Sequence, residues 1–230
     1  MWIGVTSAMH QRDAAPVGTP KRRTQAQRSA ATKDLLLAAT VDCLYELGYH
    51  KTTTYSVEQR AGLTRGALLH HFPSKSTLLI AAAEYIVAVS ERQLAAEGTE
   101  FSAADIGDEL ADWLWRQFTS RPYFAFLEIC MAARTDSVLS DALARPQEVL
   151  DAHCREALAH LVGASSDDAD FAMGVELSIR FMRGSAITAM LGERPEDHEI
   201  RRRWQRLVAP YFASAGTGRD SRLDGRPLPG

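Results

Sequence analysis

The sequence predicts an all-α protein, with a small three-helix domain at the N-terminus and a larger helical domain behind it. Apolar residues recur at three- and four-residue spacings, as on one face of a helix, and the body of the chain has no strand pattern. A chain of 230 residues is long enough for one or two domains with a proper core. Hydrophobic residues make up 46% and charged residues 24%, which is typical of a globular protein in water.

Residues 1–24 are predicted to form a disordered basic extension. They contain no long apolar stretch after a basic region, so they are not interpreted as a signal peptide. Its Lys21-Arg22-Arg23 run is either part of a solvated tail or an arm that contacts phosphates or the minor groove. A helix follows, from about Gln25 to Leu47, and Gly48 and Tyr49 end it.

A helix-turn-helix is predicted to complete the segment 25–75. Thr52, Thr53 and Thr54 offer cap hydroxyls for a short helix from Tyr55 to Ala61. Gly62 suits the sharp turn because it adopts positive φ without steric cost. Thr64 can cap the next helix, which ends before Pro73. A helix of this length fits the major groove of DNA, and residues of its first turn contact the base edges.

When Leu68 and Phe72 of this helix face the core, four residues are left free to meet a groove: Arg65, Gly66, Leu69 and His70. Ser74 can cap the helix that follows, and a phosphate beside Lys75 would offset the unfavourable position of that cation in the helix dipole. His70 and His71 point about 100° apart on a helix, so they do not converge on one ion and we expect no metal site.

This region resembles the TetR family of transcriptional regulators over about residues 29–89. The motifs that carry the resemblance are Gly48-Tyr49, Thr52-Thr53, the run from Arg60 to Gly66, and the run from His70 to Lys75. The resemblance implies a DNA-binding domain at 25–75 and a helical domain at 76–213 that binds a ligand and dimerises. It makes Arg65, Gly66 and Leu69 candidates for base contact, although Leu69 stands where the family often has a tyrosine. It also makes six residues candidates for phosphate contact: Thr53, Tyr55, Thr64, His70, His71 and Lys75.

The distribution of charge agrees with a DNA-binding end. The net charge of the chain is −3, but residues 1–80 contain ten Lys and Arg against five Asp and Glu, a balance of +5. The remainder therefore carries −8, and a basic end beside an acidic body is typical of a protein that binds DNA at one end. The cysteines, Cys43, Cys130 and Cys154, have no metal-binding spacing and are interpreted as reduced thiols in a cytoplasmic protein.

The body is predicted as a series of helices, some of them joined by short loops: Ser74–Ala96, Ile106–Phe118, Tyr123–Ala133, a short or irregular segment Asp136–Ala144, Pro146–Leu161, Ala169–Leu191 and Pro195–Phe212. Pro146 is expected to begin a helix, because proline is favoured at the first helical position. A break is predicted at Glu97-Gly98-Thr99-Glu100, and residues 214–230, rich in Gly, Arg and Pro, are predicted to form a disordered tail.

The last two helices are predicted to form the interface of a homodimer. Each has an apolar face: Phe171, Val175, Ile179, Met182, Ala186 and Met190 on one, and Ile200, Trp204, Leu207, Val208 and Tyr211 on the other. A two-fold dimer would contact a palindromic operator at half-sites about 34–36 Å apart. The alternative is that these faces belong to the core of a single chain.

The body is also expected to hold a pocket for a small hydrophobic or aromatic effector. The candidate lining residues, each of which has a place in the core as its alternative, are Trp113, Phe118, Phe124, Leu127, Met131, His153 and Met182. The preferred function is a repressor that this effector releases from its operator by changing the spacing of the two DNA-binding domains through the helix that starts at Ser74.

Two other functions are weighed against that hypothesis. A constitutive DNA-binding regulator without effector would have much the same sequence. An all-α enzyme is disfavoured because the chain has no glycine-rich phosphate loop, no metal-ligand pair and no nucleophile elbow, so neither catalysis nor a cofactor is expected. No apolar run approaches 18 residues, and we expect a cytoplasmic protein without membrane contact.

Overall fold

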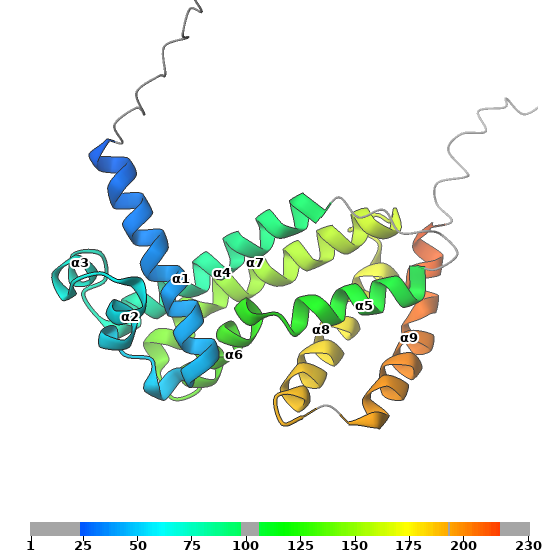
Figure 1. Ribbon diagram of the computed structural model, residues 1–230. Coiled ribbons are helices and arrows are strands. Elements are labelled where there is room, and N and C mark those ends of the chain that lie inside the picture. Colours follow the sequence, from blue (N-terminus) through cyan, green and yellow to red (C-terminus); the bar gives the residue numbers. More distant parts are fainter. Residues whose placement is uncertain (1–23, 98–105, 193, 217–230) are drawn as a thin grey trace, which may run out of the picture.

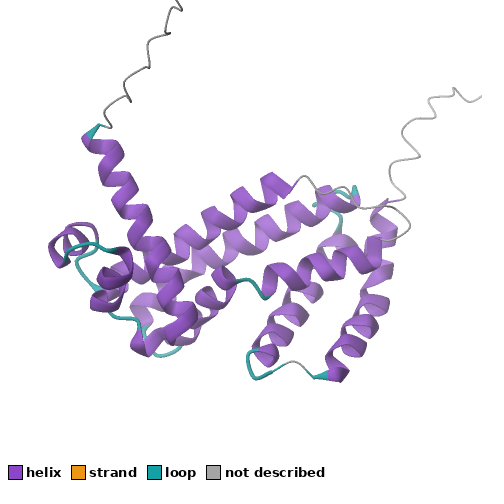
Figure 2. Cartoon of the chain, in the orientation of Figure 1, coloured by secondary structure: helices purple, strands orange, loops and turns teal. Residues whose placement is uncertain are grey.

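The computed structural model describes residues 24–97, 106–192 and 194–216, and most of these residues lie in helices (Figures 1 and 2). The predicted basic extension, most of the predicted tail and the break after Glu97 lie outside the described residues. The helices are α1 (Gln25–Lys51), α2 (Thr54–Ala61), α3 (Arg65–His71), α4 (Lys75–Glu97), α5 (Ile106–Phe118), α6 (Arg121–Ala133), α7 (Ser137–Val162), α8 (Ala169–Ala189) and α9 (Pro195–Gly216).

The DNA-binding head predicted from the sequence corresponds to α1–α3, and short-range contacts set its geometry. Thr53 caps α2 in a reciprocal pair with Ser56, and Thr64 caps α3 by accepting a hydrogen bond from the amide of Ala67 at 3.2 Å. Gly62 lies between the two helices with φ of 65°, in the left-handed region that favours glycine. Of the three threonines that could cap α2, Thr53 is the cap, while the hydroxyl of Thr52 donates to the carbonyl of Gly48. The predicted cap of α3 and the predicted turn are confirmed.

Two apolar clusters hold the chain together. The first joins α1 of the head to α4, α6 and the start of α7, and its fully buried members include Leu44, Leu78 and Ile129. The second fills the space between α5, α8 and α9, around Trp113 and Phe171. In Figure 1, α4 and α7 run side by side from the head toward the far end of the body, so α4 belongs to both halves of the molecule.

The sequence suggested that Pro146 begins a helix, and this prediction is wrong. Pro146 lies within one continuous helix, α7, which starts at Ser137 with Asp136 as its cap. A proline inside a helix removes one backbone donor and crowds the preceding turn, so it usually marks a boundary. The adjoining segment is helical because Leu139 and Leu143 are buried against the first cluster, and tertiary packing outweighs the local preference.

The face of α8 that was assigned to a dimer is mostly core of this chain. Phe171, Val175, Ile179, Met182 and Ala186 are at most 2% exposed, as the alternative interpretation held. The two helices pack closely: a Cβ built on Gly174 would lie 2.7 Å from the Cβ of Tyr211 on α9. The rings of Phe181 and Trp204 stack in parallel with their centroids 5.0 Å apart.

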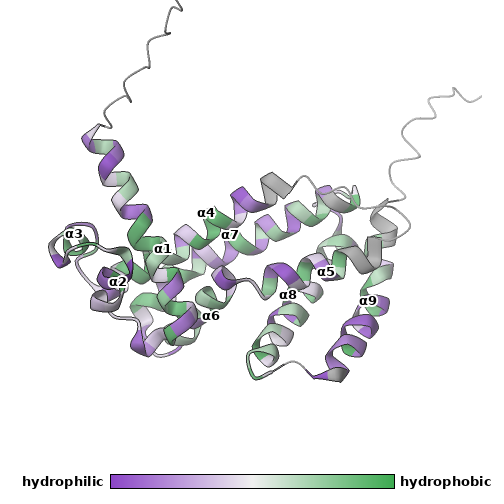
Figure 3. Ribbon diagram, in the orientation of Figure 1, coloured by the Kyte–Doolittle hydropathy of each residue, from purple (hydrophilic) through white to green (hydrophobic). Residues whose placement is uncertain are grey.

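In the described part of the chain, no single helix is long and apolar enough to cross a membrane. Only α3 and α4 taken together, with a bend of 70° between them, reach that length and composition. Figure 3 shows hydrophilic residues along α9 and along the projecting start of α1.

Candidate DNA interface and effector pocket

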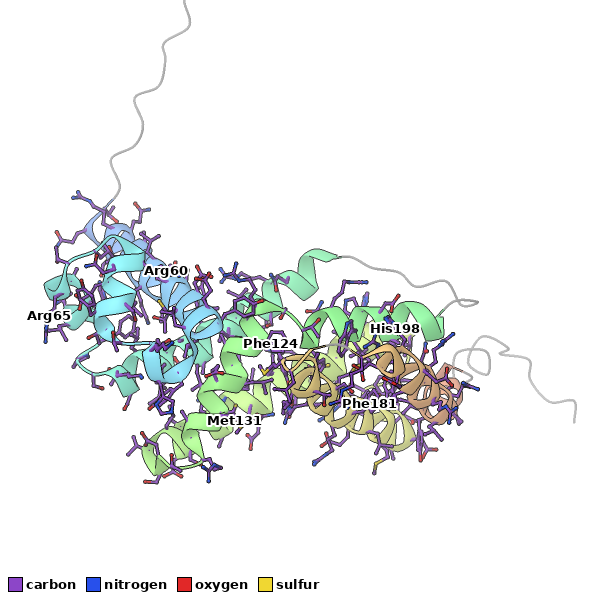
Figure 4. The ribbon with its side chains drawn as sticks, turned by 60° about the horizontal axis from the view of Figure 1, so that its bottom comes forward. Arg60, Arg65, Phe124, Met131, Phe181 and His198 are labelled. Carbon is purple, nitrogen blue, oxygen red and sulfur yellow. The ribbon has the colours of Figure 1, made fainter. Side chains whose placement is uncertain are left out.

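The end of the molecule farthest from α9 presents the exposed face of α3. Arg65, Gly66, Leu69 and His70 are all exposed on this helix, while Leu68 on its other side is fully buried. Arg65 projects from the tip of the head in Figure 4, at the opposite end from Phe181 and His198. The structure thus brings the base-contact candidates together on one surface that is open to a large partner.

Gly66 has no explanation within the chain itself. It lies in the first turn of α3 with ordinary helical geometry, and a Cβ added there would meet only the hydroxyl of Thr64, at 3.9 Å. A helical glycine is less stable than alanine, and neither a turn nor a neighbour in the chain requires a glycine here; its lack of a side chain leaves room for close approach from outside.

The phosphate-contact candidates have different surroundings. Tyr55 is 67% exposed at the start of α2, and the hydroxyls of Thr53 and Thr64 already accept hydrogen bonds as helix caps. Lys75 donates a hydrogen bond of 2.8 Å to the carbonyl of Tyr49 and lies 3.9 Å from the centre of its ring. Partial burial lowers the pKa of Lys75, and a phosphate would have to compete with Tyr49 for this ammonium group.

Contacts between α1 and α6 join the head to the body. Arg121, at the start of α6, donates a hydrogen bond of 2.6 Å to Glu46 on α1, and Arg60 of α2 pairs with the same carboxylate. Hydrogen bonds from these two arginines lower the pKa of Glu46, and the bond from Arg60 has the larger effect. One turn further along α1, the amide of Tyr49 donates to the carboxylate of Glu128 on α6 at 2.7 Å.

A cavity in the body opens between α4, α5, α6 and α7. Its volume is about 40 Å³, and the empty space reaches about 490 Å³ only when the open solvent at its mouth is included. Its lining comprises Ser90, Trp113, Gln117, Phe118, Ser120, Tyr123, Leu150, Asp151 and Cys154. This lining is mostly apolar with a few polar groups, which is typical of small-molecule sites. The cavity lies next to the head–body contacts, because Ser120 in its wall directly precedes Arg121.

Comparison with known proteins identifies the family. A model described as bacterial regulatory proteins, tetR family, matches residues 36–82. An uncharacterized HTH-type transcriptional regulator of Mycobacterium bovis is 30% identical over 181 residues, which are 78% of this chain and 93% of that protein. The chain belongs to the TetR family. It is therefore a DNA-binding transcriptional regulator with an N-terminal helix-turn-helix domain and a helical C-terminal domain, as the sequence predicted.

Other TetR-family relatives match over shorter spans. The HTH-type transcriptional regulator CymR of Pseudomonas putida is 34% identical over 131 residues, 56% of this chain and 64% of the regulator. The HTH-type transcriptional repressor AcnR of Corynebacterium diphtheriae is 33% identical over 131 residues, 55% of this chain and 64% of the repressor. The chain thus spans less than two thirds of the length of either protein.

The solved structures agree in fold. The multidrug binding protein EbrR complexed with ethidium superposes with a TM-score of 0.55 and 17% identity, over 78% of this chain and 97% of that chain. At this level of identity the likeness concerns the TetR-family fold alone.

Two of the seven effector-pocket candidates, Trp113 and Phe118, line the cavity. Met131 does not: it is 64% exposed near the end of α6, because the outer side of this helix faces solvent there (Figure 4). Phe124 is directed toward the head, where its ring stacks on Tyr45 with centroids 6.2 Å apart.

The other three candidates also lie outside the lining of the cavity. Leu127 and Met182 belong to the second apolar cluster, at 7% and 0% exposed, so for them the core alternative holds. His153 lies on α7 and its Nε2 is 2.7 Å from the carboxylate of Glu91 on α4. Its ring thus connects these two helices at the surface.

The polar part of the cavity wall was not predicted from the sequence. Ser90, Gln117 and Asp151 come from three different helices and Ser120 is the cap of a fourth, and no local motif connects them. The available indication was helical spacing: Gln117 lies four residues after Trp113 on α5, and Cys154 lies four residues after Leu150 on α7. Such spacing places side chains on one face without indicating whether the face borders core or cavity.

Proposed function

We propose that this TetR-family protein is a homodimeric repressor that binds a palindromic operator through α3 and leaves it when a small effector occupies the cavity of the body. The exposed face of α3 carries the proposal, because Arg65, Gly66, Leu69 and His70 form an open surface at the tip of a basic head. Arg65 at the first turn is suited to donate two hydrogen bonds to guanine, and Leu69 is suited to contact a thymine methyl.

Exposed apolar residues on α8 and α9 support the homodimer. Met173, Leu177 and Ile187 follow one side of α8 and are 41–51% exposed, and Leu191, in the turn just after this helix, is 86% exposed. On α9, Ile200 and Leu207 are 49% and 73% exposed. Gly184 lies in the same region of α8 with nothing within 4 Å of an added Cβ, so the backbone of a second copy has room to approach. Large exposed apolar patches are typical of interfaces.

The aromatic cavity supports an effector over the alternative of a constitutive regulator, since a regulator without effector needs no such space. Occupation of the cavity would affect the head by two routes. Ser90 in its wall belongs to α4, which begins directly after the head, and Ser120 adjoins Arg121 at the junction with α1. An effector that favours a different position of either helix would change the spacing of the two heads.

The role as repressor is supported by the name of AcnR, which matches this chain over 131 residues. The absence of an enzyme function is part of the proposal; among the described residues, no three His, Cys, Asp or Glu side chains are grouped to hold a metal ion.

In vitro selection of bound duplexes, followed by gel shift, tests the proposal. Arg65→Ala is expected to weaken operator binding by about 1–3 kcal/mol and to relax the preference at one base pair of each half-site. Arg92→Ala, which removes an exposed arginine from α4, serves as the matched control and should bind the operator normally. Selection without any preferred sequence, or equal losses in both variants, would refute the assignment of α3.

A further inference from the structure

The cavity in the body has an aromatic part and a polar part. Trp113, Phe118, Tyr123 and Leu150 provide flat or branched apolar walls, which favour a ring-shaped ligand. Asp151 contributes the only carboxylate among the described lining residues, and the lining contains no lysine, arginine or histidine. The charge at the polar end therefore depends on what compensates Asp151.

Arg183 of α8 compensates this carboxylate from behind the cavity wall. Its Nη2 donates to Oδ1 of Asp151 at 3.1 Å, and its Nε donates to the hydroxyl of Tyr123 at 3.0 Å. Gln147 donates to the other oxygen of Asp151 at 3.0 Å. One positive and one negative charge thus form a half-buried pair, with side chains 31% and 27% exposed, so the polar end is neutral as a unit.

The remaining ionisable groups in the wall keep their protons at neutral pH. Burial raises the pKa of Tyr123 to about 12, and the raising effect of burial exceeds the lowering effect of Arg183. Burial likewise raises the pKa of Cys154 to about 12. The phenol and the thiol are therefore neutral, and Tyr123 accepts a hydrogen bond from Arg183 while keeping its own proton to donate.

An ionised ligand would disturb this balance. An anion would be buried beside Asp151 without a cation of its own in the wall, and a cation would be buried beside Arg183 or would compete with it for Asp151. A neutral ligand leaves the pair intact. The free lone pairs of Asp151 accept a hydrogen bond, and the amide of Gln117 and the hydroxyl of Ser90 can donate or accept one.

We infer that the effector is an uncharged aromatic compound with a hydrogen-bond donor, such as a phenol or an aromatic amide, and that Asp151 accepts that hydrogen bond and excludes carboxylates. This inference rests on the proposed function in that the cavity is taken to be the effector site. It adds the chemical class of the effector and the residue that selects it.

The test compares two probes that share a 4-propylphenyl group and differ in the charge of their polar group, 4-propylphenol and 4-propylbenzoate. Near pH 7 the phenol is neutral and the benzoate is an anion. Binding to the full-length protein is followed by quenching of tryptophan fluorescence, with Trp113→Phe to show that the change arises in the cavity. The phenol is expected to bind at least about tenfold more tightly than the benzoate, because burying an unpaired charge is costly.

Asp151→Asn is the decisive variant, since it keeps the shape of the side chain and leaves Arg183 without its carboxylate. The preference for the phenol should fall about tenfold or reverse, as the benzoate gains an unpaired cation nearby. Asp167→Asn, on an exposed loop, should keep the preference, and melting curves check that both variants fold.

Three results would overturn the inference: a benzoate that binds as well as the phenol, a preference that Asp151→Asn leaves unchanged, or no binding of either probe up to its solubility limit. Failure of the proposed function has a different readout. In that case the phenol binds with the expected selectivity while operator affinity in the gel shift stays constant, or the protein binds no specific duplex at all.

Discussion

Replacement of Gly66 by alanine should change stability and DNA binding in opposite directions. The added methyl group meets nothing in the chain except the Thr64 hydroxyl at 3.9 Å, which is an ordinary contact. Alanine in a helix is more stable than glycine, and in the first turn we expect a gain of about 0.5 kcal/mol in the free energy of unfolding. For a chain of this size the melting temperature would rise by about 1–2 °C.

The same methyl group would be placed in the interface if α3 lies in the major groove. An extra methyl in a close-packed contact costs about 1–3 kcal/mol, so operator affinity should fall about tenfold or more. The two measurements are thermal unfolding monitored by circular dichroism and gel shift with the selected operator. A variant that is both more stable and weaker in DNA binding cannot be explained as a folding defect.

Gly184→Ala is the matched control, because this glycine also lies in a helix with no neighbour within 4 Å of an added Cβ. It should gain about 1 kcal/mol of helix stability in the monomer. In the proposed dimer it should weaken self-association, measured by sedimentation, while Gly66→Ala leaves self-association unchanged. Unaltered operator affinity in Gly66→Ala would refute the argument that the glycine makes room for DNA.

Three further predictions concern packing and the head–body junction. Gly174→Ala should destabilise the protein by about 1–3 kcal/mol, seen as a lower melting temperature, because the new Cβ would lie 2.7 Å from that of Tyr211. Glu46 has a pKa below its ordinary 4.5, so its pairing stabilises the fold above that pH and is lost as the pH falls through the lowered value. The melting temperatures of wild type and Glu46→Gln should therefore converge as the pH falls below 4.5. Glu128→Gln should weaken the contact with the Tyr49 amide by about 1 kcal/mol and alter operator affinity, whereas the exposed control Glu148→Gln should not.

The geometry of the head follows from the sequence because its determinants are close neighbours. The pairs Thr53–Ser56 and Thr64–Ala67 are three residues apart, and Gly62 needs no partner to adopt its turn. Such contacts form in any chain with these residues in this order, so the pattern alone predicts them.

The body is less predictable for a physical reason that α8 makes plain. Both sides of this helix are apolar: Met182 is fully buried, while Met173 and Leu177 are 51% and 41% exposed. Helical periodicity shows that a face exists, but when two faces are apolar it does not show which one packs inside. The side predicted to form the dimer is the buried one, and only the tertiary structure distinguishes the two sides.

The polar network of the cavity lies further beyond sequence patterns, since Asp151 and Arg183 are 32 residues apart and Arg183 and Tyr123 are 60 apart. Neither pair shares a helix, and each residue alone would be interpreted as a surface group. These residues form a network only because α6, α7 and α8 meet at one place in the fold.

Magnitudes also decide which contact is suited to couple the proposed effector site to the head. The pairing of Arg121 with Glu46 is conspicuous, but Arg121 is 53% exposed, and exposed ion pairs contribute about 0.2–1 kcal/mol. The bond from the Tyr49 amide to Glu128 is partly buried at 2.7 Å, and hydrogen bonds to charged groups contribute about 1.5–3 kcal/mol. Allosteric coupling typically amounts to about 1–3 kcal/mol, which the second contact can supply and the first cannot supply alone. Glu128 also faces Gly48, where positive φ of 74° lets α1 turn at the junction, so a shift of α6 would act where the backbone of the head bends.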